Sequence, residues 1–118
     1  PRIAHCYVQF AKAAVKASDD QIKKLENLYW FTVEYGLVYE DDLLKTWGAG
    51  NLSSYSDLRR CVDSSQIRHL EFDIDLMCNT NYDPTIQQQL LFVANSLDQA
   101  LDDLSDYFES EYGVENLV

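Results

Sequence analysis

The sequence predicts an α+β fold that is mainly helical and contains a small β-hairpin. Apolar residues recur every three or four positions over residues 22–33 and 97–108, and each stretch follows a serine with a glutamine three residues later, the spacing of a helix N-cap. Two short apolar segments flank an acidic turn at residues 40–42, which predicts the hairpin. With 118 residues, 47% of them hydrophobic, we expect one globular domain with a modest core.

The first helix is expected over residues 7–17, where apolar and alanine residues dominate. The central helix follows, with Ser18 as its N-cap and Gly36 at its end, since glycine is typical of helix C-termini. Two short helices are expected at residues 55–61 and 73–78. A final amphipathic helix follows the N-cap Ser96, with Leu97, Leu101, Leu104 and Phe108 along one face.

The hairpin pairs residues 37–39 with residues 44–47. The Gly-Ala-Gly sequence at 48–50 then predicts a tight turn or a close approach of the backbone. Residues 90–94 are uniformly apolar and short, which is typical of a buried strand.

Glu34 is the one acidic residue in the apolar run from residue 28 to residue 38. A buried carboxylate without a partner is so unfavourable that it becomes protonated, pairs with a cation or binds a metal ion. Trp30, Glu34 and Leu37 are expected to share one face of the central helix. Glu34 is therefore either a working residue or a core acid that is protonated or paired with lysine.

Charge is distributed unevenly along the chain. The net charge is -11, and the region after Arg68 contains eleven acidic residues and no basic one. Such a surface repels nucleic acids and anionic lipids, so we expect neither as a partner. No apolar run is long enough to span a bilayer, and we expect a cytoplasmic protein. The three widely spaced cysteines, Cys6, Cys61 and Cys78, are expected to be reduced thiols.

Two blocks of this sequence resemble a known enzyme family. Residues 28–37 (LYWFTVEYGL) and 47–54 (WGAGNLSS) are similar to the signature blocks of the pterin-dependent aromatic amino acid hydroxylases. The similarity continues through Phe72-Asp73, Asn79-Thr80-Asn81-Tyr82, Gln88 and the stretch 90–93, and it covers about residues 18–108. The pattern is closer to the short bacterial phenylalanine hydroxylases than to the animal enzymes.

The resemblance implies the C-terminal half of a hydroxylase catalytic domain. Such an enzyme uses iron(II), tetrahydropterin and dioxygen to hydroxylate an aromatic amino acid, most simply phenylalanine to tyrosine. In this family a facial triad of two histidines and one carboxylate holds the iron, and Glu34 matches the carboxylate.

The resemblance also implies a substrate pocket. Trp30 and Tyr35 match residues that line it, and Tyr82 matches a tyrosine on a loop that closes over the substrate. Gly50 and Ser53 match its wall near the first histidine ligand, where a serine can hold the second nitrogen of the metal-bound imidazole.

The histidine ligands depart from the family pattern. Ala4-His5-Cys6 is similar to the end of the family's His-x-x-x-x-His motif, but the first histidine of that motif would precede Pro1. His5 is thus either the second iron ligand or a solvated histidine near the terminus, and His69 is expected to be a surface residue.

Three hypotheses follow for the function. The chain is a hydroxylase or part of one, a non-catalytic relative that binds an aromatic ligand or a metal, or an acidic helical domain that binds a basic partner. The family's upstream half, which supplies much of the pterin pocket and an arginine for the substrate carboxylate, has no counterpart in these 118 residues. The sequence leaves the oligomeric state open.

Overall fold

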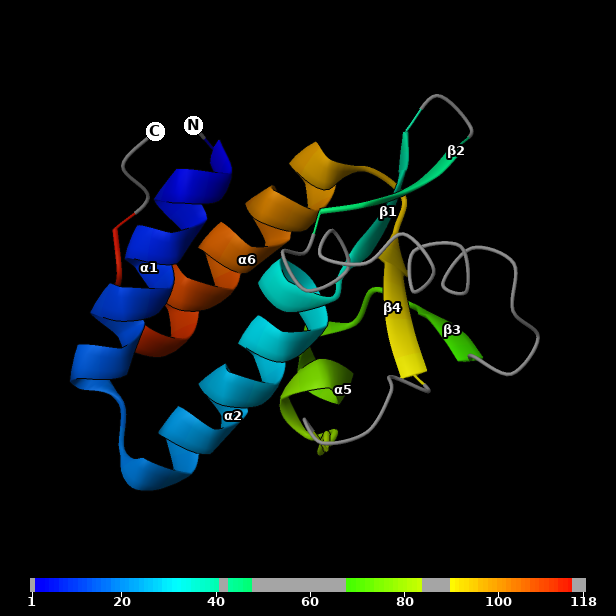
Figure 1. Ribbon diagram of the computed structural model, residues 1–118. Coiled ribbons are helices and arrows are strands. Elements are labelled where there is room, and N and C mark those ends of the chain that lie inside the picture. Colours follow the sequence, from blue (N-terminus) through cyan, green and yellow to red (C-terminus); the bar gives the residue numbers. More distant parts are fainter. Residues whose placement is uncertain (1, 41–42, 48–67, 84–89, 116–118) are drawn as a thin grey trace.

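The computed structural model describes residues 2–40, 43–47, 68–83 and 90–115. Three long helices pack together, and a β-sheet stands beside them (Figure 1). The helices are α1 (Arg2–Lys16), α2 (Asp19–Tyr29), η1 (Trp30–Glu34), α5 (Ile74–Cys78) and α6 (Leu97–Tyr112), and the strands are β1 (Leu37–Glu40), β2 (Leu43–Thr46), β3 (Arg68–Glu71) and β4 (Leu90–Ala94). The predicted α+β class, mainly helical, is confirmed.

The sheet has four strands in the order β2-β1-β4-β3. The predicted hairpin is confirmed, because β1 and β2 pair antiparallel with Leu37 opposite Thr46. The predicted buried strand is β4, which pairs parallel with β1 on one side and with β3 on the other. The sequence analysis missed β3, because its residues are mostly exposed and only its pairing with β4 holds them in an extended conformation.

The N-caps form as predicted. Ser18 accepts a hydrogen bond from the Gln21 amide, and the Gln21 side chain accepts one from the Ser18 amide, which completes the capping box of α2. Ser96 caps α6 in the same way by accepting from the Gln99 amide at 3.1 Å. The predicted helix at 73–78 is α5, with Asp73 as its N-cap.

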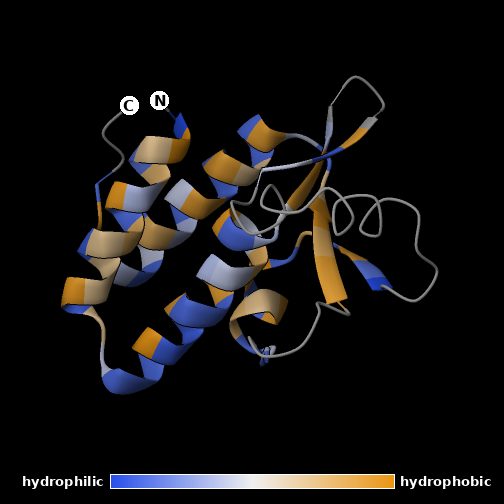
Figure 2. Cartoon of the chain, viewed as in Figure 1, coloured by the Kyte–Doolittle hydropathy of each residue, from blue (hydrophilic) through white to orange (hydrophobic). Residues whose placement is uncertain are grey.

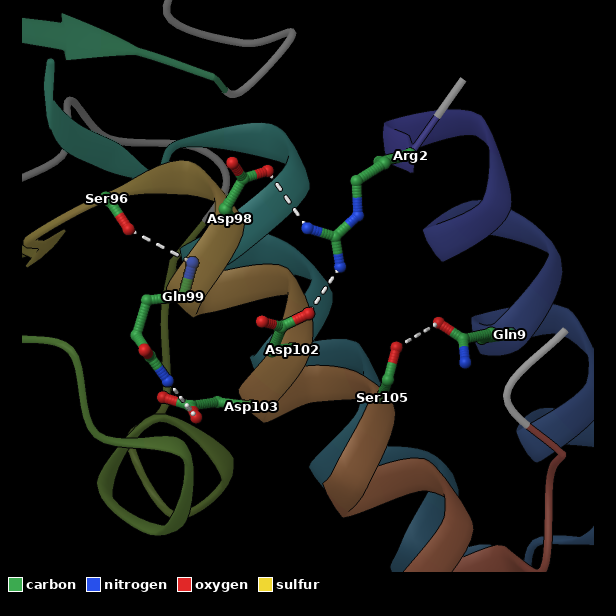
Figure 3. A network of polar contacts seen from close by, with 8 residues as sticks. All are labelled: Arg2, Gln9, Ser96, Asp98, Gln99, Asp102, Asp103 and Ser105. Atoms are coloured by element: carbon green, nitrogen blue, oxygen red, sulfur yellow. Dashed lines mark hydrogen bonds and ion pairs between the residues drawn. The ribbon is translucent and has the colours of Figure 1, made fainter. Parts of the chain in front are cut away.

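The first helix is longer than predicted, since α1 begins at Arg2 and not at residue 7. Its first turn is held by contacts to α6: the Arg2 guanidinium pairs with Asp98 at 2.9 Å and with Asp102 at 2.6 Å (Figure 3). Deeper in the same interface, the Ser105 hydroxyl donates a hydrogen bond to the Gln9 side chain. These partners lie almost a hundred residues away in the sequence, so local sequence patterns do not contain them.

The core lies where the helices meet the sheet. Phe10 of α1 and Phe108 of α6 make an edge-to-face contact with ring centroids 4.8 Å apart, and Phe31 contacts Phe92 of β4 in the same way at 5.1 Å. Apolar residues of β4 face this interior, while the outer side of α2 is hydrophilic (Figure 2). Burial of these aromatic faces is the main stabilising contribution.

The central helix ends before Gly36 as predicted, but its last turn is not α-helical. After Tyr29 it widens into the π-helical turn η1, in which the Tyr35 amide donates to the carbonyl of Trp30, five residues back. Leu37 then lies in β1, fully buried, so the predicted shared face holds for Trp30 and Glu34 but is wrong for Leu37. Gly36, where the chain leaves the helix, packs tightly against Trp47.

Candidate functional site

A pocket of about 600 Å³ lies between α1 and α2 and extends to η1. Its walls are mainly apolar and aromatic, with two carboxylates among the lining residues. The lining residues are Tyr7, Phe10, Ala11, Ala14, Ile22, Leu25, Glu26, Tyr29, Trp30, Glu34 and Tyr82. A pocket with apolar walls and few polar groups is typical of a ligand-binding site.

Glu34 lines this pocket from η1, and its side chain is half-buried. No described lysine or arginine forms an ion pair with it, since the ion pairs in this part of the chain join Arg2 to α6. Among the described residues, Glu34 is therefore not a core acid that is paired with lysine.

The carboxylates also affect the neighbouring phenols. Burial raises the pKa of the Tyr82 hydroxyl above its usual value, and the nearby Glu26 and Glu34 raise it further. Burial likewise raises the pKa of Tyr29, with contributions from Tyr7 and Glu34. Both hydroxyl groups therefore stay protonated at neutral pH.

Three of the predicted pocket residues form one aromatic group. The ring of Tyr82 stacks on Trp30 with centroids 4.1 Å apart and an interplanar angle of 8°. Tyr35 contacts Trp30 as well, at 4.6 Å and 44°. Trp30 and Tyr82 line the pocket, whereas Tyr35 packs beside Leu37 and Leu91 and reaches the pocket through Trp30. Gly50 and Ser53 lie outside the described residues, as do the turn predicted at 48–50 and the helix predicted at 55–61.

Neither histidine of the chain is among the described residues that line this pocket. His5 is on α1 and is not one of the described lining residues, and its Nε2 atom is buried without a hydrogen-bond partner in the described part of the chain. His69 lies exposed on β3, as predicted. Over the described ranges, no three His, Cys, Asp or Glu side chains are grouped closely enough to hold a metal ion.

A triad of His5, His69 and Glu34 is therefore not assembled in this structure. Iron ligation by Glu34 or by His5 stays a prediction. The described donor set fits one carboxylate ligand and not the pair of imidazoles that a facial triad needs.

The thiols are placed as expected for structural cysteines. Cys6 and Cys78 are both free and buried. Burial raises the pKa of the Cys6 thiol to about 12, so it is protonated and unreactive at neutral pH. Cys61 lies outside the described residues.

Sequence analysis missed several residues of the pocket. Glu26 is one, although it stands eight positions before Glu34 on the same continuous helical segment. Tyr7 is another. It is an exposed residue of α1, and only the packing of α1 beside α2 brings it to the pocket.

Comparison with known proteins identifies the family. Residues 1–113 match the family model of the biopterin-dependent aromatic amino acid hydroxylases. The chain belongs to this family. It is 39% identical to human tyrosine 3-monooxygenase over 106 residues, which is 86% of the chain and 20% of that protein. It is 34% identical to phenylalanine-4-hydroxylase of Dictyostelium discoideum over 110 residues, 93% of the chain and 25% of that protein.

The fold is that of part of the hydroxylase catalytic domain. The crystal structure of Chromobacterium violaceum phenylalanine hydroxylase with bound Fe(III) superposes with a TM-score of 0.84 at 34% identity, covering 95% of this chain and 41% of that one. The chain thus spans about a quarter or less of these curated relatives and less than half of the solved structure. Among the described residues, no helix has both the length and the apolar character needed to cross a membrane.

Proposed function

We propose that this chain is the C-terminal part of the catalytic domain of an iron- and tetrahydropterin-dependent hydroxylase that converts phenylalanine to tyrosine. The observation on which the proposal depends is the position of Glu34 in a pocket walled by Trp30 and Tyr82. The family membership supports it. Structures of the C. violaceum enzyme contain iron with phenylalanine, and iron(III) with oxidised 7,8-dihydrobiopterin.

Under this proposal, each residue of the site has a distinct role. Glu34 supplies the carboxylate ligand, with His5 as a candidate second ligand and Ser53 as the residue that orients a metal-bound imidazole. Trp30 and Tyr82, which stack on each other, offer aromatic surface to the ring of the substrate, and Tyr35 contacts Trp30. The family resemblance assigns Gly50, which lies outside the described residues, to the pocket wall. Iron, pterin and dioxygen supply the oxidation chemistry, while the protein supplies ligation and orientation.

Phenylalanine is the proposed substrate because the superposed bacterial structure is a phenylalanine hydroxylase. The curated relatives include a tyrosine hydroxylase, so tyrosine is the competing substrate. One small group in an apolar pocket changes discrimination by only about 1–3 kcal/mol, and a direct assay with phenylalanine, tyrosine and tryptophan decides between them.

A chimera tests the proposal. The matching C-terminal portion of C. violaceum phenylalanine hydroxylase is replaced by this chain, and iron content and pterin-dependent hydroxylation are measured. We expect a chimera that contains iron and hydroxylates phenylalanine, and we expect Glu34→Gln to lose both properties. Glu26→Gln is the matched control, because it removes a second carboxylate from the same pocket and should leave the iron in place.

The other outcomes separate the remaining hypotheses. A folded chimera that holds iron but gives no product favours the non-catalytic relative. A folded chimera without iron, or one whose iron is unaffected by Glu34→Gln, refutes the proposed metal site.

A further inference from the structure

Tyr82 lines the pocket from an irregular segment that follows α5. Within the described residues, the last backbone hydrogen bond before it runs from the Thr80 amide to the Met77 carbonyl at 3.2 Å. The backbone of Tyr82 itself takes part in no helix, strand or turn hydrogen bond in the described part of the chain. The place of Tyr82 at the pocket therefore depends on the contacts of its side chain.

The Tyr82 ring has neighbours on both faces and at one edge. The Trp30 indole stacks on it with centroids 4.1 Å apart and an interplanar angle of 8°. The ammonium nitrogen of Lys23 lies over the ring, 5.3 Å from its centroid. Because the indole already occupies one face, the ammonium group takes the other. Phe31 makes an edge-to-face contact with the same ring at 6.4 Å. The ring is thus held between a tryptophan of η1 and a cation of α2.

The contact of Lys23 with Tyr82 is a cation–π interaction. The electron-rich face of an aromatic ring attracts an ammonium group that lies within about 6 Å of its centroid. Asp20 and Glu26 stand three positions before and after Lys23 on α2, where a helix allows ion pairs, but among the described residues neither forms one with it. The lysine is therefore placed over the ring and not beside a carboxylate.

We propose that Lys23 is a positioning residue that keeps Tyr82 stacked on Trp30 and so holds the aromatic wall of the pocket in place for the substrate. This inference rests on the proposed function for the identity of the substrate, but the contact itself requires neither iron nor turnover. Lys23 is not among the described lining residues, so it acts through Tyr82 and does not touch the substrate.

NMR spectroscopy of the whole chain, labelled with carbon-13, tests the contact. The ring current of the Trp30 indole shifts the Tyr82 ring protons upfield, and the Tyr82 ring does the same to the Hε protons of Lys23. Lys23→Met removes the charge and keeps an unbranched side chain, whereas Lys23→Arg keeps the charge. Lys24→Met is the matched control, because it removes the same charge from the next position of α2, and the cation that lies over the described Tyr82 ring is Lys23.

We expect Lys23→Met to lower the ratio of stacked to unstacked Tyr82 by about two- to fivefold, the range of an exposed cation–π contact. The Tyr82 ring protons should then move downfield, towards the values of a solvated tyrosine. Lys23→Arg should restore their positions, and Lys24→Met should leave them unchanged. In the chimera described above, Lys23→Met should raise KM for phenylalanine by up to fivefold and leave kcat unchanged, because fewer molecules have the wall in place.

Four results overturn the proposal: Tyr82 signals that do not move in Lys23→Met, an equal movement in Lys24→Met, no recovery in Lys23→Arg, or a fall in kcat, which would give Lys23 a part in the reaction itself. The NMR comparison separates this inference from the proposed function. A chimera without iron or product, combined with the expected Tyr82 signals, counts against the proposed function alone. An active chimera combined with unmoved signals counts against the role of Lys23 alone.

Discussion

Gly36→Ala provides the sharpest test of how this site is built. Gly36 follows the π-helical turn, and a Cβ atom there would lie closer than 3.0 Å to the Trp47 indole and to the Thr32 carbonyl oxygen. That carbonyl also accepts the Gly36 amide hydrogen bond at 2.8 Å, so the backbone cannot move away without losing the bond. The substitution therefore forces a shift of Trp47, of the end of η1, or of both.

The expected cost follows from this geometry. Expelling Trp47, which is 7% exposed, would lose the burial of 150–250 Å² and roughly 4–6 kcal/mol, so a limited shift is cheaper. Overpacking of a tightly packed site typically costs about 1–3 kcal/mol. Because one of the two obstacles is backbone, we expect about 2–3 kcal/mol and a fall in Tm of roughly 8–12 °C.

Urea unfolding followed by circular dichroism measures this effect, with Trp47→Leu as a second background. In that background the indole is gone, so Gly36→Ala should cost at least about 1 kcal/mol less. The matched control is Gly113→Ala at the end of α6, where φ is +65° and the nearest atom is Lys16 Nζ at 3.9 Å. Its cost is conformational and should be equal in both backgrounds. A cost for Gly36→Ala below about 0.5 kcal/mol, or one unchanged by Trp47→Leu, refutes the steric argument.

Three further predictions concern stability. Asn27→Ala removes the buried hydrogen bond from Asn27 to the Cys78 carbonyl, and should cost about 1–3 kcal/mol and speed amide exchange in α5 first. Ser18→Ala removes the capping box and should cost about 1 kcal/mol in urea unfolding, against no measurable change for the exposed Lys12→Ala. Because burial raises the pKa of Cys6 from 9.0 to about 12, the stability that the neutral thiol contributes is intact below pH 9 and is lost as the pH rises towards 12. Cys6→Ala should flatten this part of the pH profile, and an unchanged slope contradicts the assignment.

The elements that could be predicted from the sequence are those with local causes. Ser18 and Ser96 each stand three residues before a glutamine whose amide they bind, so the starts of α2 and α6 are encoded within one turn. The hairpin of β1 and β2 is likewise encoded by two short apolar segments around an acidic turn. Local hydrogen bonds and side-chain periodicity were sufficient here.

The elements that could not be predicted depend on distant partners. β3 is an exposed strand whose conformation comes from pairing with β4, about twenty residues later. In the first turn of α1, which the sequence analysis did not predict, Arg2 pairs with Asp98 and Asp102, almost a hundred positions away. The parallel pairing of β1 with β4 joins segments more than fifty residues apart, and no single window of the sequence contains both.

The candidate site likewise contains residues that could be identified from local sequence and residues that could not. The sequence marked Glu34 because an acid in an apolar run needs a partner, and the family pattern added Trp30, Tyr35 and Tyr82, which the structure brings into one aromatic group. It could not place His5, whose relation to Glu34 depends on how α1 packs. Residues from separate elements meet only through tertiary packing.

Trp30 and Glu34 both line the pocket from the π-helical turn η1. A π-helical turn contains more residues than the 3.6 of an α-helical turn. Side chains four positions apart therefore lie on the same side of the helix, but at a different angle about its axis. Here the hydrogen bond from the Tyr35 amide to the Trp30 carbonyl closes this wider turn. The Tyr35 ring contacts the Trp30 ring, and Glu34 lines the pocket. Such turns occur often at functional sites. Trp30 and Glu34 share a side in either kind of helix, as their spacing predicts, whereas the wider turn itself is a property of the backbone that residue patterns do not reveal.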